Sequence, residues 1–320
     1  MEKLEIVKLF LANELQLTPQ ALELIYKSQN DIERIINYAK EMKLWIIDED
    51  DLEEFRRSKT NDIISNKIDV VYPEEIMEFS TEDIIRALKY RFEFLSQIIN
   101  ENNRLPDLTS LSKVKKLKKG EEATVIGMVR DKTTYSILLE DFTSHETIRM
   151  DANLVEKLFY DDVVAIKIKR YDEKLIGDKI FFPSLSFFRK PAVLKEDVIV
   201  SMQEIKVGNY TYQLMLKDVA KVYINDFKMT ILDSLIVRKY QRKGEKDIDT
   251  LISLLERRHL NPSFIISKKL YKKDLFLLDE IPDAIIVTSA DEFIYKPYKG
   301  INIFFLPNGG KLSLKEKRIV

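Results

Sequence analysis

The stretch Ala123-Thr-Val-Ile-Gly-Met-Val129 is the first of five short segments after Pro106 in which apolar residues alternate or cluster as they do in β-strands. The other four are Tyr135-Ser-Ile-Leu-Leu-Glu140, Thr147-Ile-Arg-Met150, Val163-Val-Ala-Ile-Lys-Ile-Lys169 and Lys179-Ile-Phe-Phe182. A helical pattern from Asn153 to Phe159 separates the third segment from the fourth. Five strands with a helix between strands three and four is the order of an OB-fold β-barrel. We therefore predict an OB-fold over residues 112–190.

The residues before the barrel have a helical period. Residues 1–56 predict a small helical module, in which Thr18-Pro19 provides an N-cap followed by proline at the first helical position. The pattern fades at Arg56, and residues 57–80 are predicted to be a linker. Residues 81–111 are predicted to be a connecting helix region, with one long helix from Thr81 to about Asn103. The apolar face of this helix comprises Ile84, Ile85, Leu88, Phe92, Leu95 and Ile99.

Residues 191–320 are predicted to be rich in strands. We expect strands at residues 197–202, 212–216, 221–224, 228–232, 274–278, 284–287 and 301–305, and one helix at residues 248–258. With so few helices, the region suggests one curled sheet. The predicted fold class is therefore multi-domain α+β, with a helical module, an OB-fold barrel and a third, β-rich domain.

The composition excludes most metal and nucleophile chemistry. The 320 residues contain no cysteine and only two histidines, His145 and His259, so a thiolate zinc site is impossible and imidazole ligands are scarce. No apolar run approaches the roughly 18 residues of a membrane span, and the acidic start is unlike a signal peptide. We expect a cytoplasmic protein. Abundant Lys and Glu without Cys indicates either heat adaptation or an AT-rich genome.

Charge is unevenly distributed along the chain. The formal net charge is −1, yet residues 1–110 contain 23 acidic and 14 basic side chains. The near-neutral total argues against a protein whose main task is to coat nucleic acid. The acidic first third favours protein partners, whereas the basic remainder is compatible with DNA contact.

The segment Val198-Ile-Val-Ser-Met-Gln-Glu-Ile-Lys-Val-Gly208 is similar to a phosphoesterase core strand that ends in the metal-binding motif D-x-H-x-G. Glu204 and Lys206 occupy the positions of the Asp and the His. A lysine ammonium has no lone pair and repels a nearby cation, so Lys206 cannot be a metal ligand.

Three further stretches extend this similarity over nearly the whole chain. They are Leu139-Glu-Asp-Phe-Thr143, Leu254-Leu-Glu-Arg-Arg-His-Leu-Asn-Pro262, and the segment from Leu278-Asp-Glu-Ile-Pro-Asp283 to Tyr298-Lys-Gly300. With them the chain resembles the small subunit of archaeal family-D DNA polymerase and, more distantly, the B-subunits of eukaryotic replicative polymerases. The resemblance implies a helical module, an OB-fold and a calcineurin-like phosphodiesterase domain.

Active members of that family bind two metals and remove nucleotides from 3′ ends, and this chain departs from their pattern at each motif. The last histidine motif falls on Thr288-Ser-Ala-Asp291, so Ser289 and Asp291 replace both imidazoles. Two further motifs have no counterpart, because the chain lacks the residues that should carry them. We therefore expect a shortened, inactivated domain with no catalytic residue, no metal and no cofactor.

The retained residues then have structural roles. Glu204 and Asp291, beside Lys206, are expected to be either solvated loop residues or an internal ion-pair cluster. In the second case the lysine would replace the lost metal. His259 is expected to pack and to form hydrogen bonds rather than to bind a metal. The family motifs imply structural roles for Gly208, Arg258, His259, Pro262, Pro282, Asp283 and Gly300.

Two basic runs are candidates for contact with nucleic acid, although such runs are usually solvated. The first comprises Lys113, Lys115, Lys116, Lys118 and Lys119, and the second comprises Arg238, Lys239, Arg242 and Lys243. Phe142, Tyr135 and Tyr160 are aromatic side chains on which bases would stack if they faced a groove. Barrel-core or partner-facing positions are the alternative for these three.

Three functions remain open from the sequence. The first is a non-catalytic accessory or scaffold subunit of an archaeal replicative DNA polymerase or replisome complex, cytoplasmic and nucleoid-associated. It would bind the catalytic subunit, and its acidic helical module would recruit another replication protein. The second is an OB-fold adaptor that binds single-stranded DNA. The third is a cryptic metal-dependent phosphoesterase or exonuclease with rearranged ligands.

Overall fold

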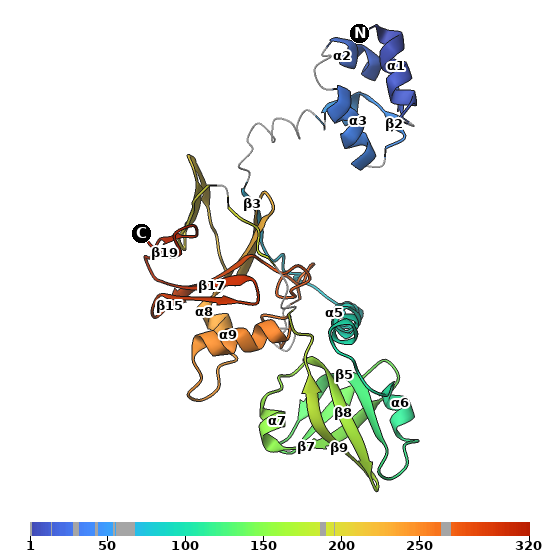
Figure 1. Ribbon diagram of the computed structural model, residues 1–320, viewed down its shortest axis with the longest axis vertical. Helices are drawn as coiled ribbons and strands as arrows, with labels where there is room; N and C mark the ends of the chain where they lie inside the picture. Colours follow the sequence, from blue (N-terminus) through green and yellow to red (C-terminus); the bar gives the residue numbers. More distant parts are fainter. Residues whose placement is uncertain are drawn as a thin grey trace. The chain divides into compact units, whose positions relative to one another are not determined.

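Figure 1 shows the computed structural model, which describes residues 2–13, 15–27, 32–41, 44–53, 55, 68–185, 190–194, 196–263 and 270–320. The chain divides into two compact units, residues Met1–Lys67 and Ile68–Val320. It is a mixed α+β protein with several sheets. Among the described residues, no helix has both the length and the apolar composition needed to cross a lipid bilayer.

The first unit consists mainly of helices. They are α1 (Lys3–Leu11), α2 (Pro19–Lys27), α3 (Ile32–Glu41) and a further helical stretch at residues 49–53. Two short strands, β1 (Gln16–Leu17) and β2 (Ile46–Ile47), pair in parallel. The Thr18 hydroxyl accepts the N–H of Ala21 at 3.2 Å and so caps α2. Ile6, Phe10, Ile25 and Ile47 are buried in a core of the unit's own.

The second unit begins with a strand, which corrects the predicted linker. β3 (Ile68–Val71) pairs antiparallel with β13 (Val219–Ile224). The prediction of a linker over residues 57–80 is therefore wrong for residues 68–71, and residues 57–67 lie outside the described residues. Four residues of mixed polarity are too short to show a strand period, so the partner strand decides their structure.

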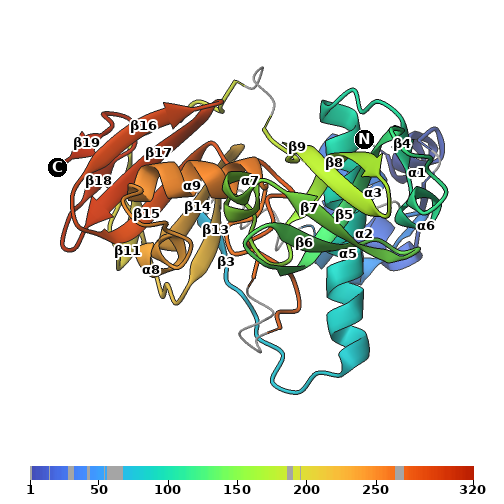
Figure 2. The same cartoon turned by 90° about the horizontal axis from the view of Figure 1, so that it is seen from below.

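Helix α5 (Thr81–Asn102) follows, with Ser80 as its N-cap. Its end agrees with the predicted helix end near Asn103. β4 (Leu108–Thr109) and the short helix α6 (Leu111–Val114) come next. In Figure 2, α5 runs beside the barrel, and the half that begins at Thr81 extends past the barrel strands. Its other half is anchored by Leu95 and Ile99, which pack against Met128 and Val163 of the barrel.

The barrel has the predicted order of five strands with a helix between the third and the fourth. The elements are β5 (Glu122–Lys132), β6 (Ser136–Glu140), β7 (His145–Met150), α7 (Ala152–Glu156), β8 (Val163–Tyr171) and β9 (Lys174–Phe181). The strands pair in the order β5-β6-β7-β9-β8, and β8 also pairs with β5, which closes the barrel. Val125, Ile148, Val164 and Ile166 fill the interior and have no exposed surface.

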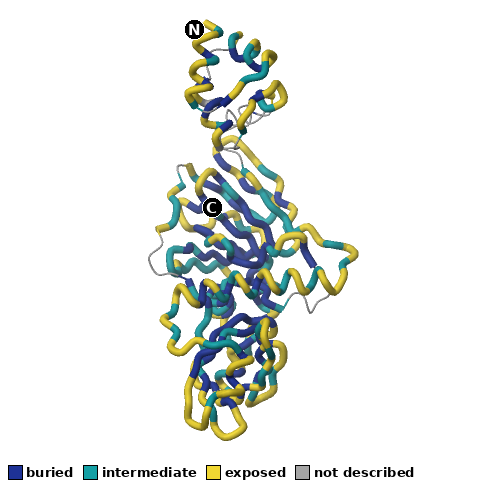
Figure 3. Tube along the Cα trace, turned by 90° about the vertical axis from the view of Figure 1, so that its right-hand side faces the viewer, coloured by how far each residue is buried: buried dark blue, intermediate teal, exposed yellow. Residues whose placement is uncertain are grey.

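A six-stranded sheet forms the centre of the remaining region. Its order is β16 (Ile294–Tyr298), β17 (Ile301–Pro307), β15 (Ala284–Ala290), β14 (Phe227–Asp233), β13 and β3, with β14, β15 and β17 parallel. Helices α8 (Ser234–Arg238) and α9 (Asp247–Glu256) connect β14 to β15. Ile285 and Val287 lie in the core on the α9 side, whereas Ala284 and Ile286 face the opposite side. Figure 3 shows these central strands as largely buried.

A second, five-stranded sheet covers that opposite side. Its order is β12 (Tyr210–Gln213), β11 (Glu204–Val207), β10 (Val198–Val200), β18 (Leu312–Ser313) and β19 (Arg318–Ile319). The prediction of one curled sheet is therefore wrong. Central strands that are apolar on both faces need cover on both faces, and here a helix layer and a second sheet provide it.

The predicted strand at residues 274–278 is also absent from the described structure. Leu275, Phe276 and Leu278 are buried in the core beside α9, but the segment turns and makes only one isolated bridge, between His259 and Leu277. A short apolar run indicates burial, and it does not by itself specify a strand.

Candidate functional site

Two residues that the resemblance aligned with the first metal motif lie on the solvent-facing side of an antiparallel strand. Glu204 and Lys206 are in β11, whose alternate residues Ile205 and Val207 are buried between the two sheets. Because successive side chains of a strand point to opposite faces, Glu204 and Lys206 point away from this core. Lys206 is exposed.

Residues that the resemblance aligned with the last histidine motif lie where the parallel strands β14 and β15 end. Ser289 donates a hydrogen bond from Oγ to the Asp233 carboxylate at 3.3 Å, and its carbonyl accepts the Ser234 hydroxyl at 2.8 Å. The Met202 thioether lies 4.0 Å from Ser289 Oγ. Asp233 also accepts the N–H of Leu235 and so caps α8. Ligands of α/β sheets usually bind at such strand ends, but these groups are engaged with one another.

The predicted cluster of Glu204, Lys206 and Asp291 is wrong. Glu204 forms its ion pair with Lys311 at 3.2 Å, and Asp291 forms its own with Arg238 at 2.8 Å. Lys206 makes no ion pair with either carboxylate in the part of the chain that the structure describes. Within the same residues, no group of three or more His, Cys, Asp or Glu side chains converges as a metal site would require.

The helix-end motif Leu254–Pro262 terminates α9 in a Schellman motif. The N–H of Arg258 bonds the carbonyl of Leu255 at 2.9 Å, and the N–H of His259 bonds the carbonyl of Leu254 at 3.3 Å. Arg258 has a φ of 51°, in the left-handed region that glycine usually occupies at this position. The chain reverses there, which directs Arg257 and His259 into the protein interior.

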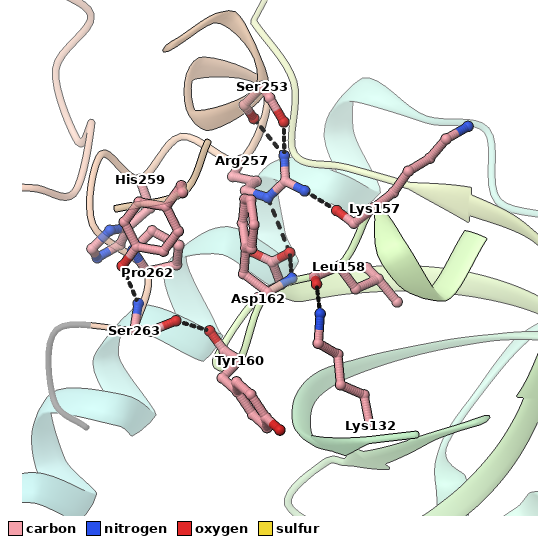
Figure 4. A network of polar contacts seen from close by, with 12 residues as sticks. Lys132, Lys157, Leu158, Tyr160, Asp162, Ser253, Arg257, His259, Pro262 and Ser263 are labelled. Carbon is pink, nitrogen blue, oxygen red and sulfur yellow. Dashed lines mark hydrogen bonds and ion pairs between the residues drawn. The ribbon is translucent and has the colours of Figure 1, made fainter. Parts of the chain in front are cut away.

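Arg257 joins α9 to the barrel (Figure 4). Its Nε donates to Asp162 at 3.0 Å, and its Nη1 donates to the carbonyl and hydroxyl of Ser253 at 2.6 and 2.7 Å. Nη2 donates to the carbonyl of Lys157. Both members of the Arg257–Asp162 pair are buried. The pair therefore fixes the barrel against the three-layer region without exposing either charge.

Aromatic rings enclose this guanidinium. Its carbon lies 4.4 Å from the Phe159 ring centre and 4.6 Å from that of Phe182. Burial raises the pKa of Asp162. The positive charge of Arg257 and the hydrogen bond from the Phe159 N–H partly oppose that rise. Burial likewise lowers the pKa of Arg257, and the negative charge of Asp162 opposes this decrease. Removal of one member of such a pair would leave the charge of the other buried without a partner, which strongly destabilises the fold.

A second buried group of polar residues joins α5 to the same motif. Arg91 donates to the carbonyl of Pro262 at 2.7 Å and to Asp274 at 3.0 Å. His259 Nε2 lies 2.9 Å from the same carboxylate, and the N–H of Asn261 donates to His259 Nδ1 at 3.1 Å. Since Nδ1 accepts this N–H, the proton of the neutral ring belongs on Nε2.

This environment keeps His259 neutral. Burial, followed by the charge of Arg91, lowers its pKa to about 4. Protonation at Nδ1 would also remove the hydrogen bond from Asn261. Burial disfavours the charge of Asp274, but His259 and Arg91 outweigh it and lower the pKa of that carboxyl. The histidine is thus a structural group with both nitrogens engaged.

The remaining motif residues lie in turns and at a strand junction. Gly208 and Gly300 have φ values of 55° and 79° in the two-residue turns after β11 and β16. Asp283, preceded by the buried Pro282, accepts the N–H of Ala192 and the N–H of Lys228, both at 2.8 Å. It therefore ties the start of β15 to β14 and to the segment that leaves the barrel.

The first basic run lies on and after α6, beside the barrel. Lys115 forms an ion pair with Glu146 at 3.1 Å, and Lys119 forms one with Asp172 at 2.8 Å. The other three are exposed and form no ion pair with a described residue; they are Lys113, Lys116 and Lys118.

The second basic run is largely engaged with protein groups. Arg238 forms ion pairs with Asp247 and Asp291, and Lys239 Nζ donates to Asn261 at 3.1 Å. The Arg242 guanidinium carbon lies 5.5 Å from the Phe159 ring centre, and Lys243 is exposed.

The structure adds an apolar groove between α5 and the barrel. Its volume is ≈ 690 Å³, and its walls come from α5, β5 and the turn after β6. Phe92 and Phe142 meet edge to face there, with ring centres 4.8 Å apart. Ile85, Leu88 and Met128 line it as well. The predicted apolar face of α5 signals this surface, because Ile85, Leu88 and Phe92 belong to it, although only its second half is fully buried.

The charges at the rim of the groove are mostly neutralised within the protein. Arg130 pairs with Glu140 at 3.1 Å and with Asp161 at 2.6 Å. Asp141 accepts backbone N–H groups, among them that of Leu111 at 2.8 Å, which holds the turn that presents Phe142. Tyr135 and Tyr160 are partly or largely exposed outside the groove lining, so the three candidate aromatic residues do not form one surface.

Comparisons with known proteins give little direct information. No protein-family description and no curated protein matches the chain. Among solved structures, similarity is found to the telomere capping protein Ten1 from Saccharomyces pombe, with 19% identity over 23% of this chain and 77% of that chain, at a TM-score of 0.20. The S. pombe Stn1-Ten1 complex matches with 18% identity over 24% and 77%, at 0.21. The hypothetical protein ygiW from E. coli matches with 15% identity over 23% and 88%, at 0.21.

Proposed function

We propose that this protein is a non-catalytic accessory subunit of a replicative DNA polymerase or replisome complex. In this proposal the closed barrel is an OB-fold, and the three-layer region is a shortened, inactivated calcineurin-like phosphodiesterase domain. The motif resemblance supplies the polymerase context. The observation that carries the architectural role is an exposed apolar groove on a unit whose parts are joined by buried charge pairs.

The groove suits an apolar segment of the catalytic subunit. Ile85 and Phe142 are 58% and 59% exposed, and the rim charges are largely satisfied within the chain. An apolar occupant would remove these side chains from water at little electrostatic cost, as at the centre of a protein interface. The buried pairs Arg257–Asp162 and Arg91–Asp274 keep the walls of the groove in place before the partner arrives, which reduces the entropy cost of binding.

A pair of groove variants tests this function. Affinity purification of the tagged chain from its source cells is expected to recover a DNA polymerase catalytic subunit, identified by mass spectrometry. The double variant Ile85→Asp with Phe142→Asp should lose that subunit. Tyr135→Asp, which changes an aromatic residue that is 65% exposed outside the groove lining, should retain it.

Two outcomes contradict the proposal in different ways. Recovery of ribosomal or metabolic proteins alone removes the polymerase assignment. Recovery of the polymerase by the double variant keeps the assignment but excludes the groove as its docking surface. Unchanged circular dichroism melting of the variants must accompany either result.

One observation favours a second candidate, a single-stranded DNA adaptor. Lys113, Lys116 and Lys118 are exposed beside the barrel, and no described carboxylate pairs with them. Binding of a labelled oligonucleotide, followed by fluorescence anisotropy, should then weaken as salt rises and should be lost when all three are changed to Glu. Absence of binding at low salt removes this candidate.

A further inference from the structure

The only tryptophan of the chain lies on the surface of the first unit. Trp45 is 81% exposed, and its neighbour Ile46 is 56% exposed. Figure 3 shows exposed positions along this unit around its buried core. Tryptophan is large and apolar, and it is one of the residue types that contribute most to binding energy at protein interfaces. An exposed Trp-Ile pair is therefore a candidate anchor for a partner.

The backbone that carries this anchor is fixed on both sides. The Trp45 carbonyl accepts the N–H of Gln16 at 2.9 Å, and the Ile47 carbonyl accepts the N–H of Thr18 at 3.0 Å. Ile47 is buried in the core of the unit. Trp45 is thus presented by a held strand end, so little backbone entropy is lost when it is covered.

Four consecutive acidic residues follow the anchor. Asp48 and Asp51 form a reciprocal cap, in which the N–H of each donates to the carboxylate of the other at 3.0 Å. Glu49 and Asp50 are exposed between them. No ion pair links any of the four to another residue that the structure describes. We call Trp45, Ile46 and residues 48–51 the Trp45 surface.

The charge of the Trp45 surface selects its occupant. Four adjacent carboxylates repel the phosphates of nucleic acid and the head groups of anionic lipids. They also disfavour a symmetric pair of copies, because a two-fold axis would bring the acidic runs together. A protein segment with both apolar and basic side chains complements the anchor and the carboxylates at once.

We propose that the Trp45 surface binds a basic, amphipathic segment of a partner protein. Apolar side chains of that segment cover Trp45 and Ile46, while its Lys or Arg side chains pair with the carboxylates or lie over the indole ring. This inference extends the proposed scaffold role to a second partner. It does not depend on the groove, so either proposal can fail while the other stands.

Because Trp45 is the only tryptophan, its fluorescence reports on this surface alone in the full-length protein. The probe is a synthetic amphipathic helix with Leu at positions i, i+3 and i+4 and Lys elsewhere, titrated into the protein. We expect a saturable blue shift of the Trp45 emission, with an apparent affinity that falls as sodium chloride is added. A matched peptide with Glu in place of Lys should produce no shift.

Charge reversal provides the control. The double variant Glu49→Lys with Asp50→Lys leaves the Asp48–Asp51 cap intact and should weaken the apparent affinity roughly fivefold or more. Glu173→Lys with Glu292→Lys makes the same charge change on exposed residues of the other unit and should leave the affinity unchanged. Equal shifts with both peptides, no shift, or a shift that depends on protein concentration without peptide would overturn the proposal.

Discussion

The strand ends around Ser289 and the joint around Arg257 accommodate charge in opposite ways. At the strand ends, Asp291 makes an ion pair with Arg238 near the surface. Glu204, in β11 of the second sheet, makes a separate surface pair with Lys311. At the joint, a buried guanidinium meets a buried carboxylate between two aromatic rings. The motif positions that resemble a metal site are thus held loosely, while the positions that fix the barrel in place are held tightly.

The largest expected effect is at the joint. Arg257→Leu leaves Asp162 buried without its cation, so we expect a loss of about 3–5 kcal/mol in the free energy of unfolding. Arg242→Leu makes the same chemical change at a less buried arginine that also lies over Phe159, and it should cost much less. Urea denaturation followed by circular dichroism measures both. Equal costs would mean that the joint is no tighter than its surroundings.

The second effect is a pH dependence that comes from His259. Its pKa is about 4 in the folded protein and 6.5 for an unperturbed side chain, so the unfolded chain binds the proton more readily. This contribution to stability is present above about pH 6.5 and declines as the pH falls towards 4, by roughly 3 kcal/mol in total.

The variant His259→Gln removes this titration and leaves His145 unchanged. Its stability at high pH will be lower, because the packing around Asp274 changes. Between pH 6.5 and 4 its stability should fall less steeply than that of the original protein, as measured by urea midpoints across this range. Parallel slopes for the two proteins would show that His259 does not carry the pH dependence.

The smallest effects are expected for the two exposed-face residues of β11, Lys206 and Glu204. Lys206→Ala removes an exposed side chain that has no described ion pair, so the melting temperature should change little. Glu204→Ala removes a surface pair with Lys311, which is worth about 0–1 kcal/mol. A large loss of stability from Lys206→Ala, measured by thermal melting, would contradict this expectation.

Local sequence patterns predicted several elements well, because the formation of these elements depends on residues that are close together in the sequence. The alternation in residues 123–182 predicted the order of strands and helix in the barrel, because a strand with one buried face has a period of two. The resemblance implied only structural roles for Gly208 and Gly300, and the structure shows both in left-handed turn conformations. For the groove, the apolar face of α5 indicated Ile85, Leu88 and Phe92 but not that the first half of the helix stays open.

Other features depend on residues that are far apart in the sequence. The strand at residues 68–71 exists because β13 pairs with it, and the second sheet exists because β14, β15 and β17 are apolar on both faces. The interpretation of Glu204, Lys206 and Asp291 as one cluster was wrong because it assumed that residues from related motifs stay together. The distance between two charged side chains is a property of the packed sheets, not of the motif.

The sequence by itself determined the periods, the turns and the scarcity of histidine and cysteine side chains, because these depend on residue type and local spacing. Only the tertiary structure decided the pairing of Arg257 with Asp162, the contact of Arg91 with Pro262, the groove and the exposure of Trp45. The physical reason is that burial and ion pairing depend on which elements pack together. That packing is set by the whole chain and cannot be read from any single stretch of it.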